Sequence, residues 1–284
     1  LKPNIRLIAE SYYKKDPDRI SNLRLFFAIY IEYLLMFFAF KIILINRSTV
    51  QLFRLDMLSQ ILLLSGLRSG SRCLVFEQCL GLLTAAIIER LGGEGACVHI
   101  HRGLIAQAIP CVQSMDFDEQ TYSTFLPLRV ATLLNGKVDE DEENAESSSS
   151  NMLKSIRHYF QSEASLARRM DRLRREKIAW QLISDQQIDC LFIAVKGVDP
   201  TDVLARTWHS LRLASTIVLY SPISEPLICA YNWLKENGAV HVQVCDSFQR
   251  SYQVLPESTH PVMQQLVAAG FILSAIKVQP PQSL

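Results

Sequence analysis

The sequence lacks the residue spacings that hold metal ions, and it lacks a strong net charge. Its seven cysteines include no C-x-x-C pair and its six histidines show no ligand spacing, so no metal site is expected. Most cysteines lie in apolar runs such as CLVF and CLFIAV, which is typical of reduced, buried thiols in an intracellular protein. Because the formal charge is only +1, any nucleic-acid surface must come from local clusters of basic residues.

The signatures of several common catalysts are also missing. There is no G-x-S-x-G elbow, no P-loop lysine and no H-E-x-x-H pair, so these kinds of catalysis are not supported. Asp189, Asp199 and Asp202 near a predicted strand end could form an acidic site, but a helix cap at Asp199 is the commoner use of such a residue. The chain begins at Leu1 and shows no secretory signal pattern there. Because an initiating Met is missing, we expect the sequence to be a fragment.

The sequence does contain an alternation of short apolar runs with amphipathic segments. RCLVFE and ACVHIH have the length of buried strands, and LLTAAIIERLGG between them has helical spacing and a glycine stop. The alternation predicts an α/β fold, a Rossmann-like doubly wound sheet with an antiparallel edge, as in class I methyltransferases and many other proteins. The predicted strands are 72–77, 96–101, 190–195, 215–222, 240–248 and 270–278. The predicted helices are 54–67, 82–93, 199–212 and 225–238, and 155–185 is either one long helix or two.

Two segments depart from this alternation. Leu25–Ile45 is a run of 21 residues, long enough to cross a bilayer, although Glu32 and Lys41 would each be costly at membrane depth. A transmembrane helix, a buried or partner-facing helix and a translated intron are the three interpretations. Asn135–Ser150 is acidic, rich in serine and without apolar periodicity, which predicts a disordered linker.

The loop after the first predicted strand lacks the glycines of a cofactor site. In such sheets, glycines after this strand let the backbone approach a ligand, whose carboxylate meets a helix N-terminus. Glu77–Leu82 contains one glycine, Gly81, next to the bulky Leu80. The second strand ends at His101 and Arg102, without the acid that would hold ribose hydroxyls. Both features predict a fold that has lost cofactor binding.

Basic residues cluster in two places. Six lie within 168–177 on a helical pattern, which fits either a solvated helix face compensated by Asp171 and Glu176 or contacts to RNA phosphates. The segment 12–19 mixes basic residues with tyrosines that could stack on bases. Lys196 follows a predicted strand at the edge where α/β sheets bind their ligands.

These segments resemble a known family. RCLVFEQCLGLLTAAIIERLGG (72–93) is similar to the degenerate cofactor region of the non-catalytic, tRNA-binding subunit of eukaryotic tRNA (adenine-58-N1) methyltransferases. SYQVLPESTHPVM (251–263), followed by GFILSAIKV, is similar to that family's C-terminal signature, in which QVLP-x-x-[ST]-HP is a specific motif. YYKKDPDRISNLR and RLDMLSQIL are similar to its segment before the first strand.

The resemblance implies a catalytic partner and an RNA substrate. In this family a homologous subunit with an intact loop binds S-adenosylmethionine, and two heterodimers form a nuclear heterotetramer that grips tRNA. The present chain would bind no cofactor itself and would support formation of N1-methyladenosine at position 58 in the TΨC arm. The residues implied to contact tRNA are Tyr13, Lys14, Lys15, Arg19, Arg168, Arg169, Lys196, Lys235, Arg250, Gln253 and His260. Alternatively, His260 has no contact with RNA, and the THP sequence (259–261) only stabilises the conformation of a loop.

The resemblance also implies how the chain is divided. Residues 1–24 would lead from a β-barrel domain that is almost absent, and 55–134 and 154–284 would be two halves of one methyltransferase-like domain, joined by the linker 135–153. Residues 25–54 have no counterpart in the family. Our hypothesis is an unspliced or mispredicted exon boundary, which sequencing of the transcript across the junction tests: a message that always retains these codons excludes it.

Two departures from the family and two rival functions stay open. Ser258 stands where the family usually has arginine, and 267–270 replaces a glycine run, which implies a lost RNA contact and a stiffer loop. The rivals are an active methyltransferase with an unusual loop and a membrane-anchored interaction protein based on Leu25–Ile45. The missing glycines argue against the first rival, and Glu32 and Lys41 argue against the second.

Overall fold

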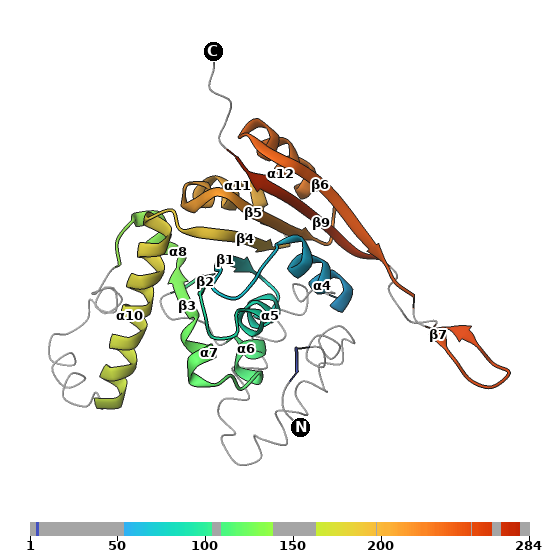
Figure 1. Ribbon diagram of the computed structural model, residues 1–284, viewed down its shortest axis with the longest axis horizontal. Coiled ribbons are helices and arrows are strands. Elements are labelled where there is room, and N and C mark those ends of the chain that lie inside the picture. Colours follow the sequence, from blue (N-terminus) through green and yellow to red (C-terminus); the bar gives the residue numbers. More distant parts are fainter. Residues whose placement is uncertain are drawn as a thin grey trace, which may run out of the picture.

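A seven-stranded mixed sheet forms the centre of the molecule (Figure 1). The computed structural model describes residues 4–5, 54–103, 109–138, 163–196, 198–250, 252–262 and 268–278. The strands, in spatial order, are β3 (Phe125–Arg129), β2 (Ala96–His101), β1 (Arg72–Glu77), β4 (Ile188–Ala194), β5 (Leu211–Ser221), β9 (Ala268–Lys277) and β6 (Ala239–Phe248).

The directions of the strands confirm the predicted fold class. Strands β3, β2, β1, β4 and β5 are parallel to one another, and β9 is antiparallel to both β5 and β6. Because β9 lies between β5 and β6, the antiparallel strand is next to the edge and β6 forms the edge itself. The limits of β1 and β2 are those predicted from their apolar runs.

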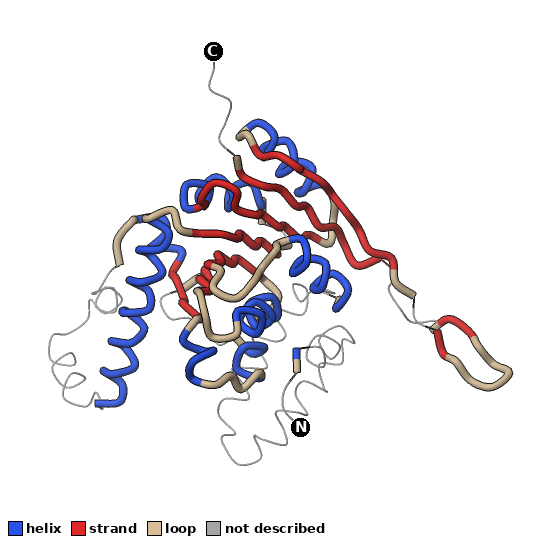
Figure 2. Tube along the Cα trace, viewed as in Figure 1, coloured by secondary structure: helices blue, strands red, loops and turns tan. Residues whose placement is uncertain are grey.

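Helices cover both faces of the sheet, as doubly wound folds require (Figure 2). They are α4 (Leu55–Leu64), α5 (Leu82–Leu91), α6 (Pro110–Ser114), α7 (Glu119–Ser123), α8 (Val130–Asn135), α10 (Glu163–Ser184), α11 (Pro200–Thr207) and α12 (Glu225–Glu236). One face of the sheet packs its core against α4, α5 and α6, and the opposite face packs against α10, α11 and α12. Alternate side chains along each strand serve the two cores, which is why the buried strands appear as continuous apolar runs.

Two predictions about individual elements were wrong. The edge strand β3 was not predicted, because FLPLR is short and Pro127 is disfavoured in strands other than edges. The helix predicted to reach Arg212 ends at Thr207, and Trp208–Ser210 forms a 3₁₀ turn. Strand β5 then begins at Leu211 opposite Ile188, four residues before the predicted start.

The predicted helix ends and thiol states are largely confirmed. The carboxylate of Asp199 accepts a hydrogen bond from the backbone N–H of Thr201 at 2.8 Å, so this aspartate caps α11. Helix α5 ends at Gly92 with φ of +64°. All seven cysteines are free thiols; five are buried, Cys245 is half-buried, and Cys229 is exposed, contrary to the general expectation.

Helix α4 is tied to the edge strand by a buried arginine. Arg54, which immediately precedes α4, is only 2% exposed. Its guanidinium donates to Asp56 Oδ1 at 2.8 Å and to the backbone carbonyl of Ser247 in β6 at 3.0 Å. The Ser247 hydroxyl in turn donates to Asp56. These contacts connect the segment before the first strand to the last third of the chain.

A narrow arm extends away from the body at one side (Figure 1). Strand β6 leads into it, and a small hairpin of β7 (Tyr252–Gln253) and β8 (His260–Pro261) forms its end. Every residue from 252 to 260 is exposed. Several large apolar side chains lie exposed along the strand and hairpin, namely Val240, Val244, Phe248, Tyr252, Val254, Leu255 and Val262.

Some predicted segments lie outside the described residues. These are Leu25–Ile45, the segment 12–19 and most of the acidic linker. Among the helices that the structure does describe, none combines the length and the apolar composition needed to span a bilayer.

The close approach of two strand ends at Gly270 gives a test of the fold. A Cβ at Gly270 would lie 2.8 Å from both Pro222 Cα and Ser221 O, and φ there is +100°. At Gly66, φ is also positive but a Cβ would meet nothing within 4 Å. We expect Gly66→Ala to cost about 1–2 kcal/mol from backbone strain alone, and Gly270→Ala to cost clearly more. Urea midpoints of the two variants measure this; equal losses would contradict the packing.

Candidate functional site

The loop after β1 is closed by a carboxylate of the chain itself. Glu77, the last residue of β1, accepts hydrogen bonds from the backbone N–H of Leu83 at 3.3 Å and of Thr84 at 2.7 Å, and from the Thr84 hydroxyl. These amides form the N-terminus of α5, where an anionic ligand would bind in such a fold. Desolvation raises the pKa of Glu77, against the lowering effect of these hydrogen bonds. The helix N-terminus is therefore already occupied.

The outer side of the same loop is filled by a side chain. Gly81 has φ of +83°, and a Cβ placed there would lie 1.6 Å from Ile109 Cγ2. Leu80 next to it has φ of +57°, a left-handed conformation that favours glycine. The carbonyl of Leu80 accepts a hydrogen bond from the backbone N–H of Cys111 at 3.2 Å. The backbone of the loop is thus left-handed at Leu80 and Gly81, and the side chain of Ile109 fills the space beside Gly81.

The loop is also bonded to the neighbouring strand. The backbone N–H of Gln78 donates to the carbonyl of Ala194 in β4 at 2.9 Å. The Gln78 side chain accepts from the backbone N–H of Lys196 at 2.8 Å. Lys196 is exposed and stands beside the closed loop, at the carboxyl ends of the parallel strands. The sequence prediction that placed Lys196 at this edge is therefore correct in position.

The end of β2 carries two buried histidines and no acid. His99 Nδ1 lies 2.9 Å from the Thr84 hydroxyl, which also contacts Glu77. Burial lowers the pKa of His99 to about 3, with a smaller effect from nearby His101. Burial also lowers the pKa of His101, whose Nδ1 has no hydrogen-bond partner among the described residues. Both imidazoles are neutral at pH 7, so they cannot replace a carboxylate that holds ribose hydroxyls.

These residues do not fit S-adenosylmethionine. The amides that would meet its carboxylate are bonded to Glu77, and the side chain of Ile109 fills the space beside Gly81. The strand end that would hold its ribose presents His101. Within the described part of the chain, no group of three or more histidine, cysteine or acidic residues could hold a metal ion either.

A buried ion pair holds helix α10 against the end of β3. Glu176 Oε1 accepts from Arg129 Nε at 2.8 Å and from the Thr132 hydroxyl at 2.5 Å. Glu176 and Arg129 are each 7% exposed. The interpretation of Glu176 as a solvated counter-charge for the basic run was therefore wrong. Its partner stands 47 residues earlier in the chain, where no local pattern could indicate it.

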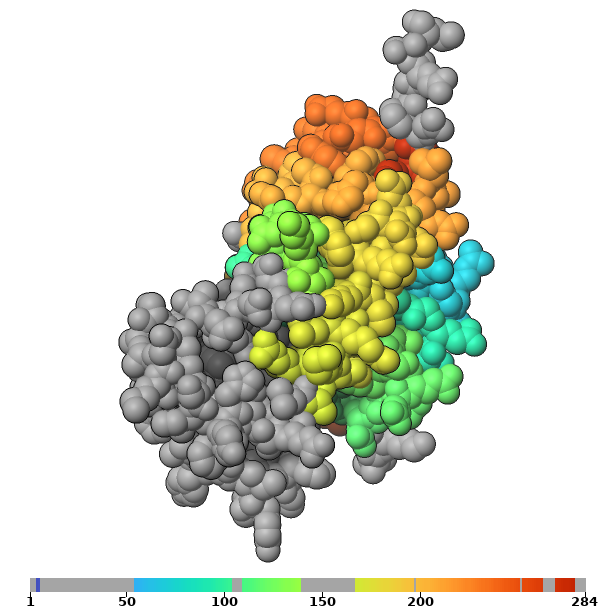
Figure 3. Space-filling view, turned by 90° about the vertical axis from the view of Figure 1, so that its left-hand side faces the viewer, coloured from blue at the N-terminus to red at the C-terminus, as the bar shows by residue number. Residues whose placement is uncertain are grey.

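Part of α10, in yellow, lies at the surface of the molecule in the view of Figure 3. Arg168, Arg174 and Lys177 are exposed. Arg175 pairs with Asp171 at 2.9 Å and stands 5.2 Å from the ring of Tyr122. The six cations of 168–177, named here the basic array, comprise the three exposed residues and the half-buried Arg169, Arg172 and Arg175, so the predicted residues Arg168 and Arg169 belong to it.

The other predicted contact residues fall into separate places. Gln253 and His260 lie opposite each other in the hairpin of the arm, and Arg250 precedes that hairpin; all three are exposed. Lys235 lies in the last turn of α12, 4.6 Å from the ring of Tyr231. Since α12 leads into the start of β6, Lys235 lies near the amino ends of the parallel strands, whereas Lys196 lies at their carboxyl ends. The remaining four, Tyr13, Lys14, Lys15 and Arg19, lie outside the described residues.

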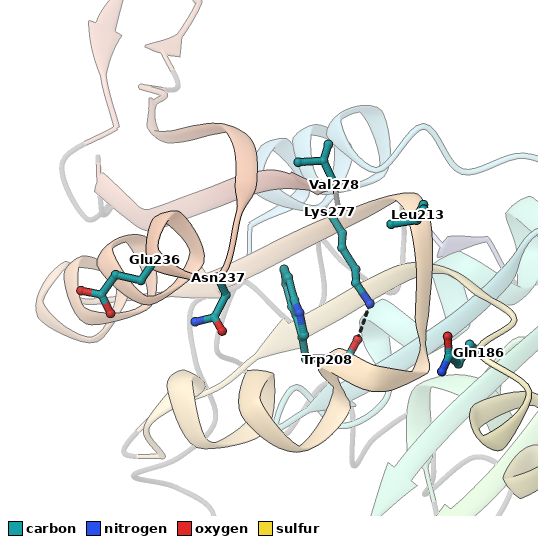
Figure 4. Close-up of a pocket in the computed structure, with 7 residues that line it drawn as sticks. All are labelled: Gln186, Trp208, Leu213, Glu236, Asn237, Lys277 and Val278. Carbon is teal, nitrogen blue, oxygen red and sulfur yellow. Dashed lines mark hydrogen bonds between the residues drawn. The ribbon is translucent and has the colours of Figure 1, made fainter. Parts of the chain in front are cut away.

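A shallow hollow of about 530 Å³ lies near the start of β5 and the end of β9 (Figure 4). Trp208, Leu213 and Lys277 contribute to its walls. The ammonium group of Lys277 donates to the backbone carbonyls of Trp208 at 2.8 Å and of Leu211 at 2.7 Å. This lysine therefore closes the start of β5, and the hollow has no connection with the loop after β1.

Comparison with known proteins finds a match to one family model and two informative relatives. The model of the Gcd10p family matches residues 31–157. A protein of Dictyostelium discoideum named tRNA (adenine(58)-N(1))-methyltransferase non-catalytic subunit trm6 is 27% identical over 300 residues, covering 99% of this chain and 51% of the relative. The mouse protein named as the corresponding subunit TRM6 is 25% identical over 335 residues, covering 98% of this chain and 60% of the relative. The chain thus spans 51% and 60% of the length of these two relatives.

A similar solved structure supports the fold. An S-adenosylmethionine-dependent O-methyltransferase from Thermotoga maritima superposes with a TM-score of 0.52 at 14% identity, covering 85% of this chain and 72% of that one. At this identity the similarity shows the Rossmann-like methyltransferase fold alone.

The buried His99 predicts how stability depends on pH. Because the pKa of His99 is about 3 in the folded chain, only the unfolded chain gains this proton below about pH 6.5. Stability should therefore fall as the pH drops below 6.5, by up to about 1.4 kcal/mol per pH unit for this group. We expect His99→Asn to lose about 2 kcal/mol less than the wild type between pH 6.5 and 5. Denaturant unfolding measures this, with exposed His209→Asn as control; parallel curves for all three would contradict the assignment.

Proposed function

We propose that the chain is the non-catalytic subunit of a tRNA (adenine-58-N1) methyltransferase, because the Gcd10p family model matches residues 31–157 and two relatives carry that name. In this role it positions tRNA while a separate, homologous subunit carries the methyl donor. The single observation that carries the proposal is the closed loop after β1, where Glu77 and Ile109 take the place of a ligand. A chain with this loop and these relatives fits a supporting role better than a catalytic one.

The substrate contacts are proposed from charge and exposure. RNA affinity depends mainly on cations that neutralise phosphates, so the basic array on α10 and the exposed Lys196 are the strongest candidates. Arg250, Gln253 and His260 add hydrogen-bonding groups on the arm, and Lys235 is a more distant contact. The segment 12–19 with Tyr13, Lys14, Lys15 and Arg19 remains part of the proposal. Their separation implies an extended grip on a large RNA and not a single pocket.

The partner subunit is proposed to dock on the arm and on β6. Of the two strands at the edges of the sheet, β3 is short and covered by α10, whereas β6 is ten residues long and has no further described strand beside it. Val244, Phe248 and Tyr252 are exposed along this edge. An open edge with exposed apolar side chains is a surface that another chain usually covers. A heterotetramer of two heterodimers, located in the nucleus, completes the proposal.

Reconstitution tests the proposed function. The chain, a cognate catalytic subunit and the two purified together should be compared for methyl transfer to tRNA. We expect activity from the mixture only, and co-elution of the two chains as one complex, because the loop of this chain leaves no place for the donor.

The two rival functions predict different results. Methyl transfer by this chain alone, or saturable binding of S-adenosylmethionine to it, would identify an active enzyme and overturn the interpretation of Glu77. Recovery of the full chain in the membrane fraction without the catalytic subunit would favour the membrane-anchored interaction protein.

A second experiment tests the docking surface. We expect Phe248→Asp to weaken association with the catalytic subunit about tenfold or more, because a charge would replace an apolar anchor that is 78% exposed in the isolated chain. The measurement is the dissociation constant of the two subunits. Ile228→Asp, at a 55% exposed position on α12, is the matched control and should leave association unchanged. Equal effects of the two changes would place the interface elsewhere.

A further inference from the structure

Helix α10 carries a buried acid in the middle of its basic run. Six arginine and lysine residues lie between positions 168 and 177, and two acids lie among them. Asp171 is half-exposed and pairs with Arg175 on the helix surface. Glu176 instead turns inward and is 7% exposed. The two acids therefore have different environments, although the sequence gives them the same appearance.

Glu176 fixes α10 through contacts to a different element. One carboxylate oxygen accepts hydrogen bonds from the side chains of Arg129 and Thr132, and a longer one of 3.4 Å from the backbone N–H of Arg129. On the same stripe of the helix, at spacings of three and seven residues, Ala179 and Ile183 are fully buried against the sheet. The buried face thus combines apolar residues, which pack against the sheet, with one charged residue, whose hydrogen bonds fix the rotation of the helix about its axis.

The anchor determines which way the cations point. Residues three or four apart share a helix face, and turning the helix by one position moves every side chain by about 100°. With Glu176 held inward, Arg174 and Lys177 are exposed, and Arg175 lies over the ring of Tyr122. Apolar contacts alone would tolerate sliding or rotation more readily than a carboxylate bonded to Arg129 and Thr132.

We propose that Glu176 is a positioning residue for RNA binding: its bonds to Arg129 and Thr132 hold α10 in the orientation that presents the basic array to RNA phosphates. The inference rests on the proposed function, since it needs α10 to contact tRNA. It names a negatively charged residue as necessary for affinity to a polyanion.

The charge of Glu176 makes the inference testable by sign. If Glu176 were only a counter-charge, its removal would make α10 more positive and would strengthen RNA binding. If it positions the array, its removal misaligns the cations and weakens binding. The slope of log Kd against log salt adds a second readout, because it counts phosphate contacts and is insensitive to general loss of stability.

The experiment measures tRNA affinity of the complete two-subunit complex at several salt concentrations. We expect Glu176→Ala to weaken binding about tenfold and to lower the salt slope by about 2, as for the loss of two phosphate contacts. Glu176→Gln, which keeps an acceptor oxygen, should recover part of the affinity. Asp171→Ala is the matched control, because it removes an exposed acid from the same helix; it should bind unchanged or more tightly.

Several outcomes would overturn the inference. Unchanged or tighter binding by a folded Glu176→Ala complex would show that the residue is a counter-charge only. If that variant does not fold, Thr132→Val removes one bond to the carboxylate at nearly constant volume; unchanged affinity and slope there would also overturn it. If Arg174→Ala with Lys177→Ala, at two exposed positions of the array, leaves the affinity unchanged, the array does not contact RNA and the inference fails, while reconstituted methyl transfer would still support the proposed function.

Discussion

The carboxylate of Glu77 sits on the N-terminus of α5, and the surrounding structure depends on that contact. Burying an acid costs free energy, which the amides of Leu83 and Thr84 and the positive end of the helix offset. The hydroxyl of Thr84 also contacts His99 in β2, so hydrogen bonds join β1, α5 and β2. This end of α5 is therefore bonded within the chain, and the amides of Leu83 and Thr84 are already engaged by Glu77.

The two edges of the sheet are finished in opposite ways. At one edge the short strand β3 is covered by α10, which is held by Glu176 and carries the cations outward. At the other edge β6 is long, exposed and prolonged into the arm. The cations of α10 and the exposed apolar side chains of β6 therefore lie at different edges of the sheet.

The sequence was sufficient for those features that depend on local pattern. Strands β1 and β2 were predicted at their observed limits, and the failed glycine pattern predicted the altered loop. The sequence was insufficient for features that depend on contacts between residues far apart in the chain. Pro127 concealed β3, because its edge position is known only once the strands are ordered. The burial of Glu176 depends on Arg129, and the projection of the arm depends on where β6 leaves the sheet. The predicted RNA contacts gain positions from the structure, and their roles stay predictions.

The left-handed backbone at Leu80 has a consequence for how this chain can evolve. Leu80→Gly would relieve the local strain, yet it would leave the carboxylate of Glu77 on the helix N-terminus and Ile109 against Gly81. At least three separated positions, including the end of β2, would have to change together before a ligand gained from any of them. A ligand site at this loop would therefore require coordinated substitutions at positions that are distant in the sequence.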